Sequence, residues 1–262
     1  MKNILSIVNG VALVSTIVIN YLSNSGALTG NTMSTISDKY FNYFTPEGYA
    51  FSIWGLIYIG LVCMVFYTGR GLFNSKEEEP LQHKIGWWFL LSCIANSAWV
   101  CAWLNDEIGL SMILMIILLI SLAVIVYRTN NNLASQSKKE SLFVFIPFGL
   151  YFGWISVATI ANAAAWLTSI GWDGFGIDPQ LWTIIMVVVA GFVNLMVVNF
   201  RNLFVFGLVG VWALIAIAVS NGNIGQSEDI TYTCYVVAAI LFVSVCARYL
   251  RNSRVNKMFQ VK

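Results

Sequence analysis

Residues 86–104 read GWWFLLSCIANSAWVCAWL and residues 108–127 read IGLSMILMIILLISLAVIVY, with only Asn105, Asp106 and Glu107 between them. Each run has about the 20 apolar residues that a helix needs to cross the hydrocarbon core of a membrane. Both runs are apolar on all faces, whereas a membrane-spanning strand alternates apolar and polar residues over about ten positions. The stretch therefore predicts two transmembrane helices joined by a tight turn, and it indicates an all-α integral membrane protein.

The composition of the whole chain agrees with that fold class. Of 262 residues, 58% are hydrophobic and only 10% are charged, and the mean hydropathy is +0.76. Soluble domains carry about 25% charged residues, so these charges are too few to cover a water-facing surface. The composition excludes a soluble globular domain, a disordered chain and a nucleic-acid-binding module. The five cysteines all fall in apolar runs without CxxC spacing, which disfavours a disulfide framework.

The distribution of positive charge tests the number of spans. If the N-terminus is cytoplasmic and the helices alternate, 13 of the 14 Lys and Arg residues fall on the cytoplasmic side, all but Lys39. Positive charge concentrates in cytoplasmic loops, so we expect both termini in the cytoplasm. Helical spans also indicate the inner membrane if the source is bacterial, because barrels populate the outer membrane. The eight predicted spans are 4–22, 48–69, 86–104, 108–127, 142–168, 180–199, 203–220 and 230–250.

The predicted spans carry no charge near their centres. Proton-coupled pumps, voltage sensors and carriers of charged substrates need such residues, so these classes are disfavoured. Without an intramembrane lysine there is no retinal Schiff base, and the only histidine, His83, lies in a loop. The sequence also lacks a metal-ligand cluster, a phosphate-binding glycine loop and a serine or cysteine beside a base. We therefore expect no metal, no covalently bound cofactor and no catalytic residue.

Tryptophan, tyrosine and asparagine recur at steps of three and four residues in three of the spans, which places them on one face of each helix. A carboxamide in hydrocarbon needs a hydrogen-bond partner, so these faces should point into the bundle rather than toward lipid. Walls of indole, phenol and carboxamide suit a flat, mostly apolar ligand with a few polar edges. The candidate ligand-binding residues are Trp54 and Tyr58 of the second span, Asn96 and Trp99 of the third, and Trp154, Ala158 and Asn162 of the fifth.

The same residues also allow a plainer interpretation. Tryptophan collects at membrane interfaces, and Trp103 and Trp166 lie near span ends. An aromatic face inside a bundle also serves for packing, and Asn96 and Asn162 can bond across helices without touching a ligand. Spacing alone leaves both interpretations open.

The second span is preceded by a helix-start signal. Thr45 is the expected N-cap, Pro46 suits the first helical position, and Glu47 would lie at the positive end of the helix dipole. The sequence therefore predicts that this helix begins directly after Thr45.

Three segments of the chain carry a recognisable pattern. They are FTPEGYAFSIWGLIYIGL, with Trp54 and Tyr58; IANSAWVCAWL, with Asn96 and Trp99; and IPFGLYFGWISVATIANAAAW, with Trp154, Ala158 and Asn162. In order and placement they resemble the second, third and fifth helices of the tryptophan-rich sensory protein (TspO/MBR) family, the bacterial and mitochondrial translocator proteins. The resemblance covers about residues 1–170.

The resemblance implies a five-helix bundle at residues 1–170 with a pocket for porphyrin, haem or a related tetrapyrrole. The segment 23–47 would form a lid over that pocket, and the protein would form a homodimer. Some members of the family degrade porphyrin in light, but the spans of this chain lack a general acid or base. By resemblance, the pocket residues are Trp54, Tyr58, Asn96, Trp99, Trp154 and Ala158.

Residues 171–262 depart from the five-helix pattern, because they add three predicted spans and a basic cytoplasmic tail that includes Lys262. The leading hypothesis is a membrane receptor or sensor that binds a tetrapyrrole or a similar flat hydrophobic ligand. A facilitative transporter of small lipophilic molecules and an assembly subunit of a membrane complex are the alternatives. The expected partners are a small hydrophobic ligand, membrane lipid and a second copy of the chain, without nucleic acid.

Overall fold

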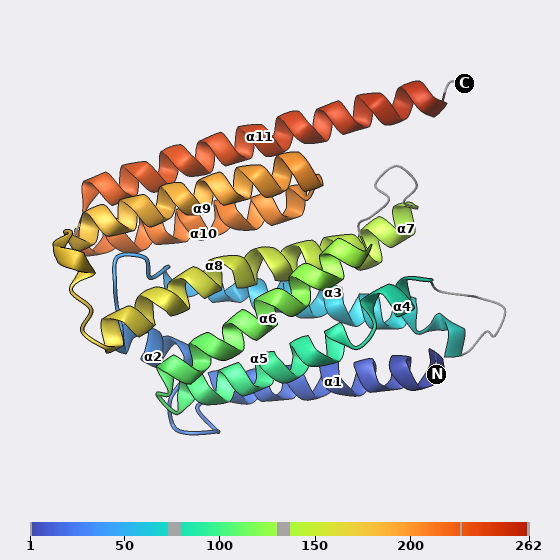
Figure 1. The fold of residues 1–262 in the computed structure, drawn as a ribbon, viewed down its shortest axis with the longest axis horizontal. Helices are drawn as coiled ribbons and strands as arrows, with labels where there is room; N and C mark the ends of the chain where they lie inside the picture. Colours follow the sequence, from blue (N-terminus) through green and yellow to red (C-terminus); the bar gives the residue numbers. More distant parts are fainter. Residues whose placement is uncertain (1, 73–79, 130–136, 226, 261–262) are drawn as a thin grey trace. The chain divides into compact units, whose positions relative to one another are not determined.

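The computed structural model describes residues 2–72, 80–129, 137–225 and 227–260, and these ranges contain helices and no strand (Figure 1). In these ranges, seven helices are long and apolar enough to cross a membrane. An eighth apolar helix, Trp88–Leu104, has 17 residues. The all-α membrane fold is thereby confirmed, although Lys262 of the basic tail lies outside the described residues. The eight helices are α1 (Lys2–Asn24), α3 (Ile53–Thr68), α5 (Trp88–Leu104), α6 (Ile108–Thr129), α8 (Ile146–Ser169), α9 (Pro179–Arg201), α10 (Phe204–Ile224) and α11 (Glu228–Gln260).

Short helical segments lie between these long helices. They are α2 (Met33–Lys39), η1 (Gly48–Ser52), η2 (Arg70–Leu72), α4 (Pro80–Ile85), α7 (Lys138–Glu140), the π-helical turn η3 (Ser141–Phe145) and η4 (Gly174–Gly176).

The chain forms two compact units. The first consists of Met1–Phe41 and Ser52–Gly171, and the second of Asn42–Phe51 and Trp172–Lys262. The division at residue 170 predicted from the sequence places 42–51 with the first part of the chain, whereas in the structure this segment belongs with the C-terminal helices.

The five long helices of the first unit form a closed ring of neighbours. α5 packs against α1 and α6, α6 against α8, α8 against α3, and α3 against α1. The turn between α5 and α6 is tight, since Asp106 has a φ of 68° and the Glu107 N–H donates to the Ala102 carbonyl at 2.9 Å. Gly60 lets α3 approach α8, because a Cβ at this position would lie 3.2 Å from Pro147 Cβ.

The polar side chains of α1 face the inside of this ring. Asn9, Thr16 and Asn20 are between 2% and 6% exposed, whereas Val11 on the opposite face is 62% exposed. The Thr16 and Ser97 hydroxyl oxygens lie 3.2 Å apart and join α1 to α5. Side-chain hydrogen bonds of this kind hold helices together where lipid replaces water as the solvent.

The second unit is built on close contact among α9, α10 and α11, each of which packs against the other two. Gly207 of α10 lies where they meet. A Cβ at this position would lie 2.5 Å from a Val198 methyl of α9 and 2.7 Å from a Val245 methyl of α11. The absence of a side chain at Gly207 therefore sets how closely the three helices approach.

The segment 42–51 is held against α10 by four hydrogen bonds and one ring contact, and the longest of these bonds runs from Asn223 Nδ2 to Glu47 Oε2 (3.4 Å). The segment and α10 are far apart in sequence, so these are tertiary contacts that hold a loop in place. The Tyr49 ring meets the Trp212 indole edge-on, with centroids 5.2 Å apart. The other three hydrogen bonds run from Glu47 N–H to the Ala216 carbonyl (3.1 Å), from Asn221 Nδ2 to the Tyr43 carbonyl (2.8 Å) and from Trp212 Nε1 to the Ala50 carbonyl (3.3 Å).

This attachment corrects the predicted start of the second span. Thr45 is not a helix N-cap, because its hydroxyl accepts the Asn42 N–H at 3.1 Å and closes a turn. The helical segment begins with η1 at Gly48, and α3 begins at Ile53. The Glu47 N–H, which the prediction placed in the first turn of the helix, is bonded to α10 instead.

Candidate functional site

The Trp54 ring is the centre of an aromatic cluster inside the first unit. Its centroid lies 5.5 Å from the Tyr58 ring, with the planes 18° apart, and 6.4 Å from the Trp99 indole. From α8, the Tyr151 ring lies 5.8 Å away and the Trp154 indole 6.4 Å away, both edge-on. Three helices that are separated in sequence therefore bring five rings together, as expected for the three aromatic faces.

Asn162 holds the Trp99 indole in place. The Trp99 Nε1–H donates to Asn162 Oδ1 at 2.8 Å, and the Ser111 hydroxyl lies 3.2 Å from the same oxygen. The Asn162 amide also donates to Ser111 Oγ at 3.1 Å. Since protein groups occupy both ends of this carboxamide, its part in the structure is to fix the plane of the indole and to join α5, α6 and α8.

The Asn96 carboxamide of α5 is bonded to α1 through its oxygen, while its nitrogen lies in the interior of the first unit. The Asn20 amide donates to Asn96 Oδ1 at 2.8 Å, and both side chains are buried. Two buried polar atoms nearby, Asn96 Nδ2 and Tyr58 Oη, make no hydrogen bond with the described residues. Most buried polar groups in proteins are bonded, so these two atoms have hydrogen-bonding capacity that the described part of the chain does not use.

The remaining predicted site residue is Ala158. It follows Trp154 by one turn of α8 and is half-buried. Its small side chain adds no ring to the cluster. Tyr151, by contrast, was missed as a site residue, although it precedes Trp154 by three positions and the same spacing argument places it on the same face.

The segment before 42 is fixed to the turn between α5 and α6. The Trp103 indole donates to the Met33 carbonyl at 3.2 Å, and the Asn31 amide donates to the Leu104 carbonyl at 3.1 Å. Lys39 and Asp106 form an ion pair. The two halves of the predicted lid, 23–47, therefore belong to different compact units, and its role as a lid stays a prediction.

Among the described residues of the first unit, charged groups lie at the ends of the spans or between them, as this ion pair illustrates. Hydrogen bonding to Lys39 lowers the pKa of Asp106, and hydrogen bonding to Asp106 raises the pKa of Lys39. Among the described residues, no group of three or more His, Cys, Asp or Glu could hold a metal ion. The aromatic cluster itself consists of ring faces, indole N–H groups and phenol hydroxyls.

A protein-family model matches most of the chain. The family described as TSPO-like protein matches residues 6–247, which run from α1 into α11 and cover most of both compact units. Comparisons with curated proteins and with solved structures found no match. The chain belongs to the TSPO-like family, and this membership confirms the resemblance seen in the sequence and supports a membrane role of the sensor or transporter type.

Proposed function

We propose that this member of the TSPO-like family binds a tetrapyrrole or a similar flat hydrophobic molecule at the Trp54-centred cluster, in a sensing, storage or trafficking role. The observation that carries the proposal is the meeting of five aromatic rings and two unbonded polar atoms inside one membrane unit. An apolar macrocycle with a few polar edges has the matching chemistry.

The polar atoms supply the first energetic argument. A buried donor or acceptor without a partner costs about 1–3 kcal/mol. Tyr58 Oη and Asn96 Nδ2 are two such atoms in the described chain. A ligand with a carboxylate or pyrrole nitrogen near them would recover this free energy, whereas a purely apolar ligand would not.

The rings supply the second argument. Stacked or edge-on aromatic pairs contribute about 0.5–1.5 kcal/mol beyond the burial of their surface. The Trp54 ring is half-buried and already in contact with four other rings. The ligand therefore enters against the accessible part of the Trp54 ring and replaces some of these contacts with its own, which costs little because one aromatic contact is exchanged for another.

The placement of the chain in the membrane is part of the same proposal. Thirteen of the 14 basic residues fall on one side when the eight spans alternate, and that side is proposed to be cytoplasmic. Both termini then lie in the cytoplasm. In a bacterium the membrane would be the inner one.

Quenching of tryptophan fluorescence by protoporphyrin tests the site. Detergent-purified protein should be quenched saturably at micromolar protoporphyrin, and Trp54→Phe and Trp154→Phe should each weaken the affinity about tenfold. Trp172→Phe is the matched control, because Trp172 contacts Phe175 and Trp182 rather than the cluster. Ala158→Leu should also block binding, since the added side chain fills space beside Trp154.

Two outcomes would count against the proposal. Quenching that never saturates would mean partitioning of porphyrin into the micelle. Equal affinity in all three Trp→Phe variants would place any porphyrin site away from Trp54 and Trp154.

A further inference from the structure

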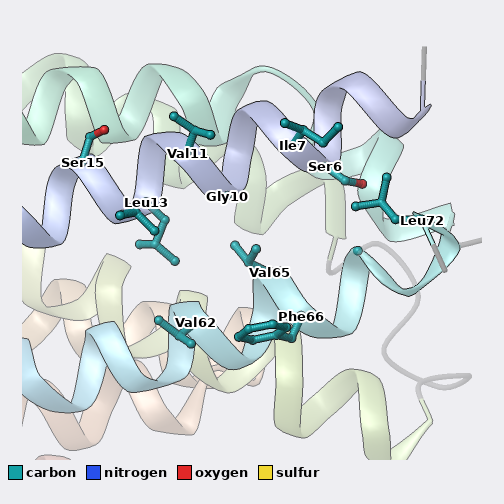
Figure 2. Close-up of a pocket in the computed structure, with 12 residues that line it drawn as sticks. Ser6, Ile7, Gly10, Val11, Leu13, Ser15, Val62, Val65, Phe66 and Leu72 are labelled. Carbon is teal, nitrogen blue, oxygen red and sulfur yellow. The ribbon is translucent and has the colours of Figure 1, made fainter.

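A separate cavity of about 500 Å³ lies between α1 and α3 of the first unit. Figure 2 shows Leu13 of α1 and Val65 of α3 pointing into the space between the two helices. Its volume falls within the range of about 300–1,000 Å³ that is typical of ligand sites. The cavity shares no lining residue with the Trp54 cluster. Its lining residues are Ser6, Ile7, Gly10, Val11, Leu13, Val14, Ser15, Val62, Val65, Phe66, Gly69 and Leu72.

We propose that this cavity holds one acyl chain of an anionic phospholipid, with the lipid phosphate at Arg70. The chemistry of the walls supports the acyl chain, because ten of the twelve lining residues are apolar or glycine and only Ser6 and Ser15 carry hydroxyls. Such walls offer a ligand burial and van der Waals contact, with few hydrogen bonds.

The length of the cavity supports a lipid over a compact ligand. On α1 the lining runs from Ser6 to Ser15, which at 1.5 Å per residue is about 14 Å. This is close to half of the hydrocarbon core of about 30 Å, and one acyl chain spans that same half. The cavity therefore has the depth of a single leaflet.

The cavity is also open to the side from which a lipid arrives. Phe66 is 73% exposed and Ile7 is 56% exposed, and both belong to membrane-spanning helices. Gly10 leaves the floor of the cavity open, since a Cβ at this position would fill it as far as van der Waals contact with Val65 Cγ1, at 3.7 Å. A chain can enter from the bilayer without crossing the protein.

A cation lies next to one end of the cavity in the sequence, although it is not among the lining residues. Arg70 lies between the lining residues Gly69 and Leu72, at the end of α3. Its Nε–H donates to the Tyr67 carbonyl at 2.9 Å, and its guanidinium lies 3.9 Å from the centre of the Tyr67 ring. Guanidinium groups recognise phosphate oxygens, and basic residues at membrane surfaces favour anionic lipids. The end of α3 is where the headgroup of a lipid in this leaflet would lie.

Native mass spectrometry of the full chain in detergent tests the proposal. Phosphatidylglycerol and phosphatidylcholine with identical acyl chains are added together. One retained phosphatidylglycerol per chain is expected, with at least fivefold higher occupancy than phosphatidylcholine. Val62→Phe fills the cavity and should reduce retention of both lipids at least fivefold. Ile59→Phe is the control, since it introduces the same phenylalanine about one turn earlier at an exposed site that does not line the cavity.

A second pair of variants tests the headgroup. Arg70→Gln should keep one lipid per chain but lose the preference for phosphatidylglycerol. Arg128→Gln, which removes one cation beside the Trp88 ring, should keep it. If Val62→Phe is not monodisperse on gel filtration, Val11→Phe fills the same cavity from α1.

The proposal is overturned if no lipid is retained, or if Val62→Phe and Ile59→Phe retain it equally. A chain that doubles in mass, and that Val62→Phe returns to a monomer, would mean that a second copy occupies the cavity. Equal retention of both lipids in the unmodified chain would overturn the assignment of the phosphate to Arg70. Protoporphyrin quenching should be unchanged in Val62→Phe, which keeps this test separate from that of the Trp54 site.

Discussion

The two compact units hold their helices together in different ways. In the first, buried side chains bond across helices, as Asn20 does with Asn96 and Trp99 with Asn162. In the second, Gly207 lets three helices approach closely, and the Asn199–Ser244 hydrogen bond between α9 and α11 is exposed. Both are known solutions to helix association in lipid. The difference teaches that buried side-chain bonds between long helices orient the rings in the first unit, as with Trp99, whereas the indole bonds of the second unit run from Trp212 and Trp182 to loop carbonyls.

The largest effect is expected from changing the glycine contact of the second unit. Gly207→Ala would place a methyl group against stiff valines of both neighbouring helices, which should destabilise the unit by about 2–3 kcal/mol. The free energy of unfolding by sodium dodecyl sulfate measures this. Gly222→Ala on the same helix, where a Cβ meets nothing within 4 Å, should be neutral or slightly stabilising. Equal effects would mean that close packing at Gly207 does not hold the unit together.

The next effect is expected from the polar bonds of the first unit. Asn162→Leu leaves the buried Trp99 Nε1–H without its acceptor, which should cost about 1.5 kcal/mol. The same unfolding titration should show the loss, and tryptophan fluorescence should report a less uniform Trp99 environment. Asn199→Leu, at an exposed bond, is the control and should cost much less. If both variants lose the same free energy of unfolding, the buried bonds of the first unit contribute no more to stability than the exposed bond of the second.

The segment 42–51 sharpens the comparison, because there the second unit does use polar bonds. Trp212→Phe keeps a ring beside Tyr49 but removes the donor to the Ala50 carbonyl. A loss of about 1 kcal/mol should raise amide hydrogen exchange in 44–51 about fivefold. Trp166→Phe in the first unit should leave exchange of this segment unchanged. An unchanged rate in Trp212→Phe would mean that the other contacts suffice to hold the segment.

The smallest effect is expected at the exposed ion pair of the first unit. Lys39 lowers the pKa of Asp106 below 3.8, so the stabilisation is present above that value and is lost as the pH falls through the lowered pKa. Asp106 raises the pKa of Lys39 above 10.5, so it is lost again as the pH rises through the raised pKa. Between these limits, Asp106→Asn should increase proteolysis near residue 39 without a measurable change in unfolding free energy. Asp38→Asn should leave proteolysis unchanged, and equal cleavage of both variants would contradict the pairing.

The eight helices and the aromatic cluster were predictable because they depend on local patterns. The length of each apolar run predicts a span. Spacings of three and four residues place Trp54, Tyr58, Trp99 and Trp154 on the inward faces of their helices. The neighbour of each face was not predictable, since spacing along one helix carries no information about another. The bond from Trp99 to Asn162 is therefore visible only in the structure.

The start of α3 shows the limit most clearly. Thr45, Pro46 and Glu47 have the residue types of a helix start, and local propensity alone would begin the helix there. In the structure the Thr45 hydroxyl accepts the Asn42 N–H and closes a turn, and the Glu47 N–H is bonded to the Ala216 carbonyl. These tertiary and local bonds hold the segment as a loop up to Gly48. The segment's membership in the second unit follows from contacts more than 160 positions apart, such as Ala50 with Trp212.

That separation also determines when these contacts can form during synthesis of the chain. The Ala50–Trp212 and Tyr43–Asn221 bonds join residues 162 and 178 positions apart. At translation rates of about 5–20 residues per second, the ribosome needs roughly 10–35 seconds to deliver α10 after residues 42–51 have emerged. During that interval α1 and α3 can insert and pair, but the segment between them has no partner. Assembly of the first unit therefore begins before the loop at the start of α3 can reach its final position, which it gains only when α10 has been made.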